Sequence, residues 1–489
     1  GVPATANKYL YTDVLRNEWK FKGFVVTDYT AVNELVPHGI AANEREAAMK
    51  AVNAGIDMDM NGNVFIRNLP QLLKDRKIKK SEIDRAVRSI LEMKFLLGLF
   101  DDPYRYLDST REKNTIMRPE FLQVAREAGR KSIVLLKNKN KIFPIEPNKP
   151  QTVALIGPLV KDKINLNGEW AGRGNREQSV SLYEGFTEVY KDSKVILTYA
   201  PGCDLTTEDR SGFGEAMDVA ANADVILAVM GEDFNWSGEA ASRTDIRLPG
   251  VQRELLQELV KLGKPVGLVL MNGRPLDLSW EDEHVDGIME AWYLGTMAGY
   301  SVADVVSGNH NPSGCLTMSF PRSVGQLPLY YNHKNTGRPV EPENPGADYR
   351  SFYLDSPNTP LYPFGYGLSY TSFDIRNMQM NTNVLRPDGE IKVSAVVANN
   401  GERDGEVVVQ LYIRDIAGSV TRPVKELRGF RKVFLPKGDS VTVEFSITPE
   451  TITMYNLDMK YVAEPGEFKV WIAVNAEDNR NEGNFTYRK

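Results

Sequence analysis

Helical and extended apolar patterns alternate over the first 105 residues of the chain. Apolar residues at helical spacing occupy 9–19, 43–54 and 81–97, and short apolar runs occupy 23–28 (GFVVTD) and 55–60 (GIDMDM). We predict helices for the first set and buried strands for the second. This order is typical of parallel sheets and barrels, but two strands alone cannot enclose a barrel, so residues 1–105 are interpreted as part of one.

The strongest helix of this region has recognisable signals at both ends. Ser81 is expected as its N-cap, with Glu82 and Asp84 in the first turn and Gly98 at its end. The charged, irregular residues after it predict a linker over 106–119.

A second α/β region follows, beginning with a helix at Glu120. Its predicted strands are 152–157, 195–200, 224–230, 265–271 and 287–292, and 251–262 is a predicted helix between them. Apolar runs separated by helical stretches favour a layered α/β domain over 120–335.

The last part of the chain changes character. Residues 336–373 are rich in Pro, Asn and Tyr without periodicity and predict a connecting segment. Short runs with β-branched alternation then occupy 391–398, 406–414, 440–447 and 468–474. Turn signals separate these runs, so we expect a small β-sandwich over 374–489.

Composition narrows the class of protein. The 489 residues are 42% hydrophobic and 25% charged, with a net charge of −6, which excludes wholesale disorder and gives no basic surface for nucleic acid. No run approaches the roughly 18–20 apolar residues of a membrane helix. Two cysteines and four scattered histidines predict neither a disulfide framework nor a metal site, and no cofactor is expected.

Carboxylate chemistry is what remains, and its first candidate is Asp28. This residue ends the predicted strand 23–28. In a barrel the carboxyl ends of the strands face the catalytic rim, so a carboxylate there is presented to a pocket. The alternative interpretation is that Asp28 is simply the N-cap of the next helix.

The second candidate is the loop 231–245, which follows a predicted buried strand. It carries the acidic residues Glu232, Asp233, Glu239 and Asp245 and the aromatic residues Phe234 and Trp236. Aromatic rings stack on the apolar faces of pyranose rings, while carboxyl groups bind hydroxyls or transfer protons, so this mixture suits a sugar site. A solvated acidic loop with packed aromatics is the alternative.

Several short motifs occur in the same order as in one known family. They are 1–7 (GVPATAN), 23–28 (GFVVTD), 237–245 (SGEAASRTD), 271–275 (MNGRP), 311–314 (NPSG), 320–321 (FP) and 362–370 (YPFGYGLSY). The chain resembles the C-terminal portion of glycoside hydrolase family 3, in its periplasmic β-glucosidase branch. Each motif is weak alone, but the ordered set is specific.

The resemblance implies a partial (β/α)8 TIM-type barrel, then an α/β sandwich, then a fibronectin type III-like β-sandwich. It implies that Asp28 is the nucleophile, on the seventh barrel strand, and that Glu239 is the acid/base. Glu232 is the competing acid/base and Glu34 a weaker third choice. A retaining glycosidase holds its two carboxyl groups about 5–5.5 Å apart, so only docking of two domains could set that distance, in an interdomain cleft.

Four further residues are expected at the substrate. Tyr29 lies where many relatives have Trp beside the nucleophile, and Trp170 and Trp236 could supply an opposing wall. Arg243 is expected to bind substrate, to orient Glu239 or to cap the loop. Ordinary packing is the alternative for each.

The function implied is an exo-acting retaining β-glycosidase of β-glucosides or oligosaccharides, with β-D-glucosidase as the leading hypothesis. A β-xylosidase of the same family and a non-catalytic carbohydrate-binding fragment are the alternatives. The resemblance also implies a periplasmic or secreted location, and it allows a homodimer. About six barrel strands, with the groups that grip the sugar, would precede Gly1, so we expect the 489-residue chain alone to be inactive.

Overall fold

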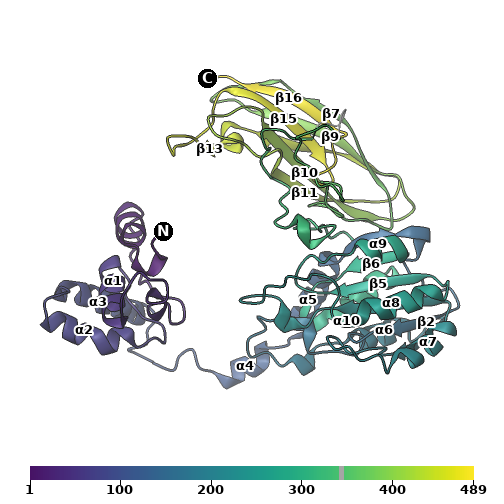
Figure 1. Cartoon of the computed structure of the whole chain (residues 1–489), viewed down its shortest axis with the longest axis horizontal. Coiled ribbons are helices and arrows are strands. Elements are labelled where there is room, and N and C mark those ends of the chain that lie inside the picture. The colour runs from purple at the N-terminus through teal and green to yellow at the C-terminus, as the bar shows by residue number, and fades with distance from the viewer. Residues whose placement is uncertain (341–345) are drawn as a thin grey trace. The chain divides into compact units, whose positions relative to one another are not determined.

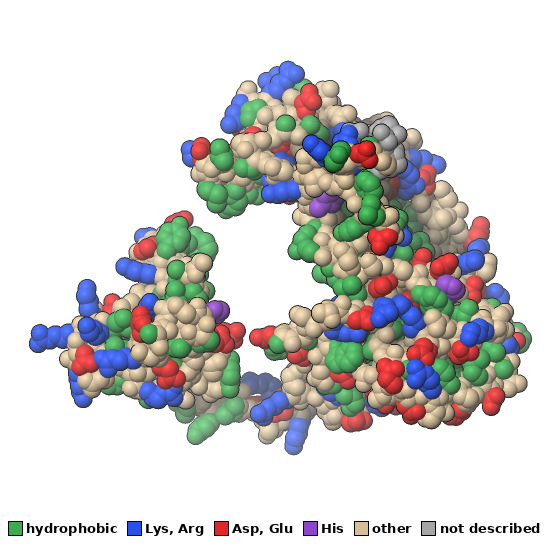
Figure 2. Space-filling model, in the orientation of Figure 1, with side chains coloured by type: hydrophobic (Ala, Val, Ile, Leu, Met, Phe, Trp, Pro, Cys, Tyr) green, Lys and Arg blue, Asp and Glu red, His purple; other side chains and the backbone are tan. Residues whose placement is uncertain are grey.

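The computed structural model describes residues 1–340 and 346–489 (Figure 1). These residues divide into two compact units, Gly1–Ile116 and Met117–Lys489. Figure 2 shows positive and negative side chains interspersed over the visible faces, in keeping with the small net charge. Within the described ranges, no helix has both the length and the apolar character needed to cross a bilayer.

The first unit is mainly helical. Its helices are η1 (Ala4–Ala6), the π-helix η2 (Tyr9–Glu18), η3 (Asn33–Leu35), α1 (Glu44–Ala54), α2 (Val64–Lys74), α3 (Lys80–Leu96) and α4 (Ser109–Thr115). The side chain of Asn43 caps α1, and Gly55, at a φ of 116°, ends it. Small side chains on α1, such as Ala47 and Ala51, let its buried face pack closely against Leu35 and Leu72.

The two predicted strands of this unit are not regular strands. Residues 23–28 and 55–60 meet at one isolated parallel bridge, between Val26 and Met58, and Val26 is 39% exposed rather than buried. The Asp57 carboxylate accepts the N–H of Val25 at 2.9 Å, in a position where a neighbouring strand would supply a carbonyl. A side chain therefore replaces part of the ladder, which the apolar pattern did not predict.

Two further local predictions need correction. Helix α3 begins at Lys80 and not after Ser81, because the Glu82 carboxylate accepts the N–H of Lys79 at 3.0 Å and draws the helix start forward. The predicted linker 106–119 also contains the helix α4, which the Asp108 side chain caps. Gly98, at a φ of 70°, ends α3 as expected. The domain limits at 105, 119, 335 and 373 stay predictions.

A six-stranded sheet organises the first part of the second unit, over the residues described there. Its strands are β1 (Val134–Asn138), β2 (Gln151–Ile156), β3 (Val195–Ala200), β4 (Val225–Gly231), β5 (Val266–Met271) and β6 (Gly287–Glu290). The order is β1-β6-β5-β4-β2-β3, parallel except for β1 at one edge. The five predicted strands are confirmed, and β1 was not predicted.

Helices cover both faces of this sheet (Figure 1). They are α5 (Pro119–Ser132), α6 (Leu182–Tyr190), α7 (Phe213–Ala221), α8 (Gln252–Lys261), α9 (Ser279–His284) and α10 (Ala298–Ser307). Alternate strand residues enter two separate cores, one with α7 and α8 and the other with α6 and α10. Burial on both faces explains why the central strands β4 and β5 are continuous apolar runs. Short 3-10 helices in the loops are η4 (Lys139–Lys141), η5 (Asn165–Asn167), η6 (Arg176–Gln178), η7 (Phe234–Trp236), η8 (Gly295–Met297) and η9 (Val324–Gln326).

The end of the chain forms the predicted β-sandwich. One sheet has the order β11-β10-β15-β16-β8 and the other β12-β9-β7, and β13 and β14 form a separate hairpin. The strands are β7 (Phe373–Met380), β8 (Val384–Leu385), β9 (Ile391–Asn399), β10 (Gly405–Asp415), β11 (Glu426–Leu435), β12 (Ser440–Ile447), β13 (Met454–Tyr455), β14 (Tyr461–Val462), β15 (Gly466–Ala473) and β16 (Glu482–Tyr487), with η10 (Pro449–Ile452) between them. Inward residues such as Val393, Val409 and Phe468 fill the core between the sheets.

Candidate active-site residues

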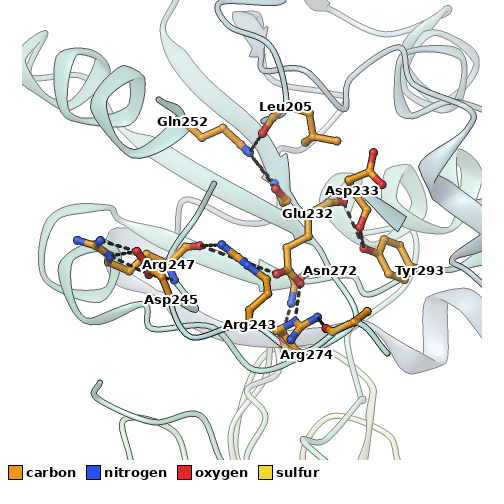
Figure 3. Close-up of polar contacts among 12 residues, drawn as sticks. Leu205, Glu232, Asp233, Arg243, Asp245, Arg247, Gln252, Asn272, Arg274 and Tyr293 are labelled. Carbon is orange, nitrogen blue, oxygen red and sulfur yellow. Dashed lines mark hydrogen bonds and ion pairs between the residues drawn. The ribbon is translucent and has the colours of Figure 1, made fainter. Parts of the chain in front are cut away.

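The loop with the predicted acid/base begins where β4 ends, at the carboxyl edge of the parallel sheet (Figure 3). The buried side chain of Gln252, on α8, fixes this end: its amide oxygen accepts the N–H of Gly231 and its amide nitrogen donates to the Gly231 carbonyl, both at 2.9 Å. The carboxyl edge of such a sheet is where ligands ordinarily bind.

Glu232, the next residue, is fully buried. One carboxylate oxygen accepts from the Arg243 guanidinium at 2.5 Å and the other from Arg274 at 3.3 Å (Figure 3). Arg274 also donates to the Ala241 carbonyl at 2.7 Å. These contacts connect the end of β4 with the second arm of the loop, residues 241–245. They also leave the Glu232 carboxylate with no exposed surface for contact with a substrate.

A second buried carboxyl group, that of Glu290, is linked to Arg274 through the side chain of Asn272. Asn272 donates from its amide nitrogen to the Arg274 carbonyl at 2.7 Å and to Glu290 at 3.2 Å. Complete burial raises the pKa of Glu290 well above its usual range, although the Trp292 N–H and Asn272 act in the opposite direction. Burial therefore favours the neutral form of Glu290, which limits charge repulsion with Glu232.

The first arm of the loop, residues 233–237, is held by contacts of its aromatic residues. The Phe234 N–H donates to the Asn165 side chain at 2.8 Å, and the Arg176 guanidinium lies 3.9 Å from the centre of the Phe234 ring. The Arg243 guanidinium lies 4.6 Å from the centre of the Trp236 ring, which is partly buried. Trp236 therefore presents only part of its surface to solvent.

Between these arms, the tip of the loop is exposed. Gly238, Glu239 and Ala240 all lie at the surface, and the Glu239 carboxylate has no hydrogen bond or ion pair with the described residues. Trp170 is 75% exposed, and its indole nitrogen would lie 3.3 Å from a Cβ built on Gly238. The structure thus brings Glu239, Trp170, Trp236 and Arg243 into one neighbourhood, with Glu239 free to contact a ligand.

Asp28 and Tyr29 lie in the first unit, and both are exposed. The Asp28 carboxylate accepts the N–H of Tyr29 at 2.7 Å, and no regular α-helix follows directly. An N-cap would accept from an amide two or three residues ahead, so the capping interpretation is wrong for this residue. Glu34 lies on η3 and is exposed, as expected for a solvated carboxylate.

Sequence reasoning did not select Arg274 or Glu169, which both contact the loop. Arg274 is part of the motif MNGRP, which was noted only as a family word, and Glu169 precedes the selected Trp170. Their proximity to residues 231–245 depends on tertiary packing, so a single sequence carries no signal of it. In the ranges 1–340 and 346–489, no group of His, Cys, Asp or Glu is arranged to hold a metal ion.

Comparison with known proteins defines the class as a multidomain glycoside hydrolase. Residues 1–93 match the N-terminal domain of glycosyl hydrolase family 3, residues 133–370 match its C-terminal domain, and residues 407–476 match a fibronectin type III-like domain. The chain belongs to glycosyl hydrolase family 3.

Similar relatives include two bacterial enzymes. The chain is 42% identical to the periplasmic β-glucosidase of Salmonella typhimurium, over 97% of this chain and 65% of that protein. It is 38% identical to a β-xylosidase of Formosa agariphila, over 98% of this chain and 66% of that protein. The crystal structure of a β-glucosidase from Listeria innocua in complex with isofagomine is 38% identical, with a TM-score of 0.93 over 99% of this chain and 66% of that one. The chain thus spans slightly less than two-thirds of the length of each of these three relatives.

Proposed function

We propose that the whole protein carrying this chain is an exo-acting retaining β-glycosidase, with terminal non-reducing β-D-glucosyl residues as its substrates. The proposal rests on the different environments of the two glutamates in residues 231–245. Glu232 is buried between two arginines, whereas Glu239 is exposed beside tryptophan rings. An acid/base must reach the glycosidic oxygen, so this contrast favours Glu239 over Glu232.

In the proposed reaction, the Asp28 carboxylate attacks the anomeric carbon while Glu239 gives its proton to the departing oxygen. The bond from the anomeric carbon to that oxygen breaks as the bond to Asp28 forms. Glu239, now a carboxylate, then takes a proton from water, and this water releases the sugar from Asp28 with net retention. The exposed side chains of Tyr29 and Trp170 offer aromatic faces for a sugar ring.

The relatives support a glucoside substrate and make a xyloside the second candidate. The Salmonella relative is named a β-glucosidase and the Formosa relative a β-xylosidase, at similar identity. We propose a periplasmic or secreted location, because the Salmonella relative is named periplasmic.

Covalent labelling of the whole protein tests this function. A 2-deoxy-2-fluoro-β-glucoside with an activated leaving group should inactivate it and leave the fluorosugar on Asp28, as located by peptide mass spectrometry. The Asp28→Asn variant is the matched control and should remain unlabelled. Faster inactivation by the corresponding xyloside would assign the enzyme to xylosides, and a protein that takes up neither label would be the non-catalytic alternative.

A further inference from the structure

Beside the tip of the loop lies Glu169, a partly buried residue with one buried carboxylate oxygen. Glu169 lies between η5 and η6, and its Oε2 atom is buried without a hydrogen-bond partner among residues 1–340 and 346–489. Buried polar atoms are nearly always hydrogen-bonded, so an exception calls for an explanation. The proposed reaction does not use Glu169.

Glu169 contacts Gly238, the residue before Glu239. Gly238 has a φ of 112°, a conformation that residues with side chains rarely adopt, and a Cβ built there would overlap Glu169 Oε2. The positive φ favours glycine at position 238, and the absence of a side chain there leaves the space that the end of the Glu169 side chain occupies. The carboxylate of Glu169 lies directly against the backbone that carries Glu239.

The backbone that carries Glu169 is itself well fixed. Arg176 donates to the carbonyls of Ile164 at 2.6 Å and Gly168 at 2.8 Å, and the same guanidinium lies over the Phe234 ring. On the other side, a Cβ on Gly168 would lie 3.2 Å from the ring of Tyr293. The Tyr293 hydroxyl in turn lies 3.2 Å from the carbonyls of Glu232 and Asp233.

We propose that Glu169 is a positioning residue for the acid/base. Its side chain acts as a wedge against Gly238 and so sets the direction in which the Glu239 side chain projects from the loop. This inference rests on the proposed function, in which Glu239 transfers the proton. Glu169 touches neither substrate nor reacting atoms. Its Oε2 atom packs against Gly238 and accepts no hydrogen bond from the described residues.

The wedge has a specific kinetic consequence. Proton donation matters most when the departing oxygen is a poor leaving group, and it contributes little when the leaving group is already acidic. A displaced Glu239 should therefore slow cellobiose hydrolysis far more than hydrolysis of 2,4-dinitrophenyl β-glucoside. A general loss of structure would instead lower both rates together.

The experiment compares Glu169→Ala and Glu169→Gln in the whole protein, on these two substrates. Glu169→Ala removes the wedge and should lower kcat/KM for cellobiose by about 10- to 100-fold, the range expected for a misplaced catalytic group, while changing the dinitrophenyl rate by less than about 3-fold. Glu169→Gln keeps the shape and should restore most of the cellobiose rate. Glu177→Gln, at an exposed position of the same loop, is the matched control and should change neither rate.

Thermal unfolding separates the wedge from a structural role. Removing a buried acceptor that has no partner should leave the Tm unchanged or raise it, so a lower Tm with parallel loss of both rates would overturn the proposal. Equal rates in Glu169→Ala and the parent protein would overturn it too. A double-mutant cycle with Gly238→Ala gives a second test, because the two replacements should be non-additive if the residues touch.

Glu239→Ala separates this inference from the proposed function. If that variant shows no dependence on the leaving group, Glu239 is not the acid/base and the proposed function fails. If Glu239→Ala shows the dependence and Glu169→Ala does not, the wedge alone is wrong.

Discussion

The two proposed catalytic carboxylates are held in different ways. The loop that carries Glu239 is braced on both arms by side chains, with the Glu232–Arg243–Arg274 cluster on one and Phe234 on the other. The segment that carries Asp28 is held mainly by backbone bonds to 57–60 around a single bridge. The loop with Glu239 is therefore held by buried side chains of its own unit, whereas the segment with Asp28 is held by local backbone pairing together with the side chains of Asp57 and Thr27.

The largest effect should come from Asp28, and it should be purely chemical. Asp28→Ala in the whole protein should lower kcat for an aryl β-glucoside by about 10⁴-fold or more, as expected when a nucleophile is removed. Because Asp28 is exposed and bonds only the neighbouring N–H, its removal should change the free energy of unfolding by less than about 0.5 kcal/mol. Steady-state kinetics and urea denaturation measure the two quantities.

A variant that keeps normal turnover would end the proposed role of Asp28. A variant that loses activity together with several kcal/mol of stability would show that the segment depends on this side chain, and the contrast between the two regions would then be wrong. Glu34→Ala, at another exposed carboxylate of the same unit, is the control and should retain activity.

On the other side of the comparison, Glu232 should matter for stability. Glu232→Gln leaves Arg243 and Arg274 without their buried counter-charge, which should cost about 3–5 kcal/mol in the free energy of unfolding. Urea denaturation of the 489-residue chain measures this. The matched control is Asp245→Asn, which breaks the exposed pair with Arg247 in the same loop and should cost less than about 1 kcal/mol. Equal losses in the free energy of unfolding for the two variants would contradict the interpretation that buried Glu232 holds the loop in place.

Apolar pattern predicted the fold best where strands are buried on both faces. The run predicted at 265–271 differs by one residue from β5, and that at 224–230 is shifted by one residue from β4; both strands are buried along nearly their whole length. Strand β11 (ELRGFRKVFL) was missed because it lies at a sheet edge, where charged residues are tolerated. The run 23–28 was overinterpreted, because hydrophobicity does not reveal which groups will pair with a backbone.

The candidate site was predictable in its residue types and not in its arrangement. The resemblance favoured Glu239 over Glu232 as the proposed acid/base, and the fold adds the difference in burial between the two side chains. Arg274 follows β5 and Glu169 follows β2, and tertiary packing brings both to the loop. Such contacts depend on tertiary structure, which local patterns do not encode.

The smallest effect concerns Tyr293, whose hydroxyl lies beneath the braced loop. Its hydrogen bonds to the Glu232 and Asp233 carbonyls should make Tyr293→Phe less stable by about 1 kcal/mol at pH 7. Burial, and secondarily the charges of Glu232 and Asp233, raise the pKa of Tyr293 above its ordinary value of about 10.

The unfolded chain therefore releases this proton near pH 10 while the folded chain keeps it. The hydroxyl's contribution is complete below pH 10 and declines as the pH rises toward the folded-state pKa. The stability gap between the parent chain and Tyr293→Phe should narrow above pH 10, as measured by urea denaturation at a series of pH values. Tyr183→Phe, where the ring contacts Tyr199 and Lys161, controls for the general loss of a tyrosine hydroxyl. A gap that widens above pH 10 would mean that the loop favours the ionised Tyr293, which is incompatible with a hydroxyl that donates to backbone carbonyls.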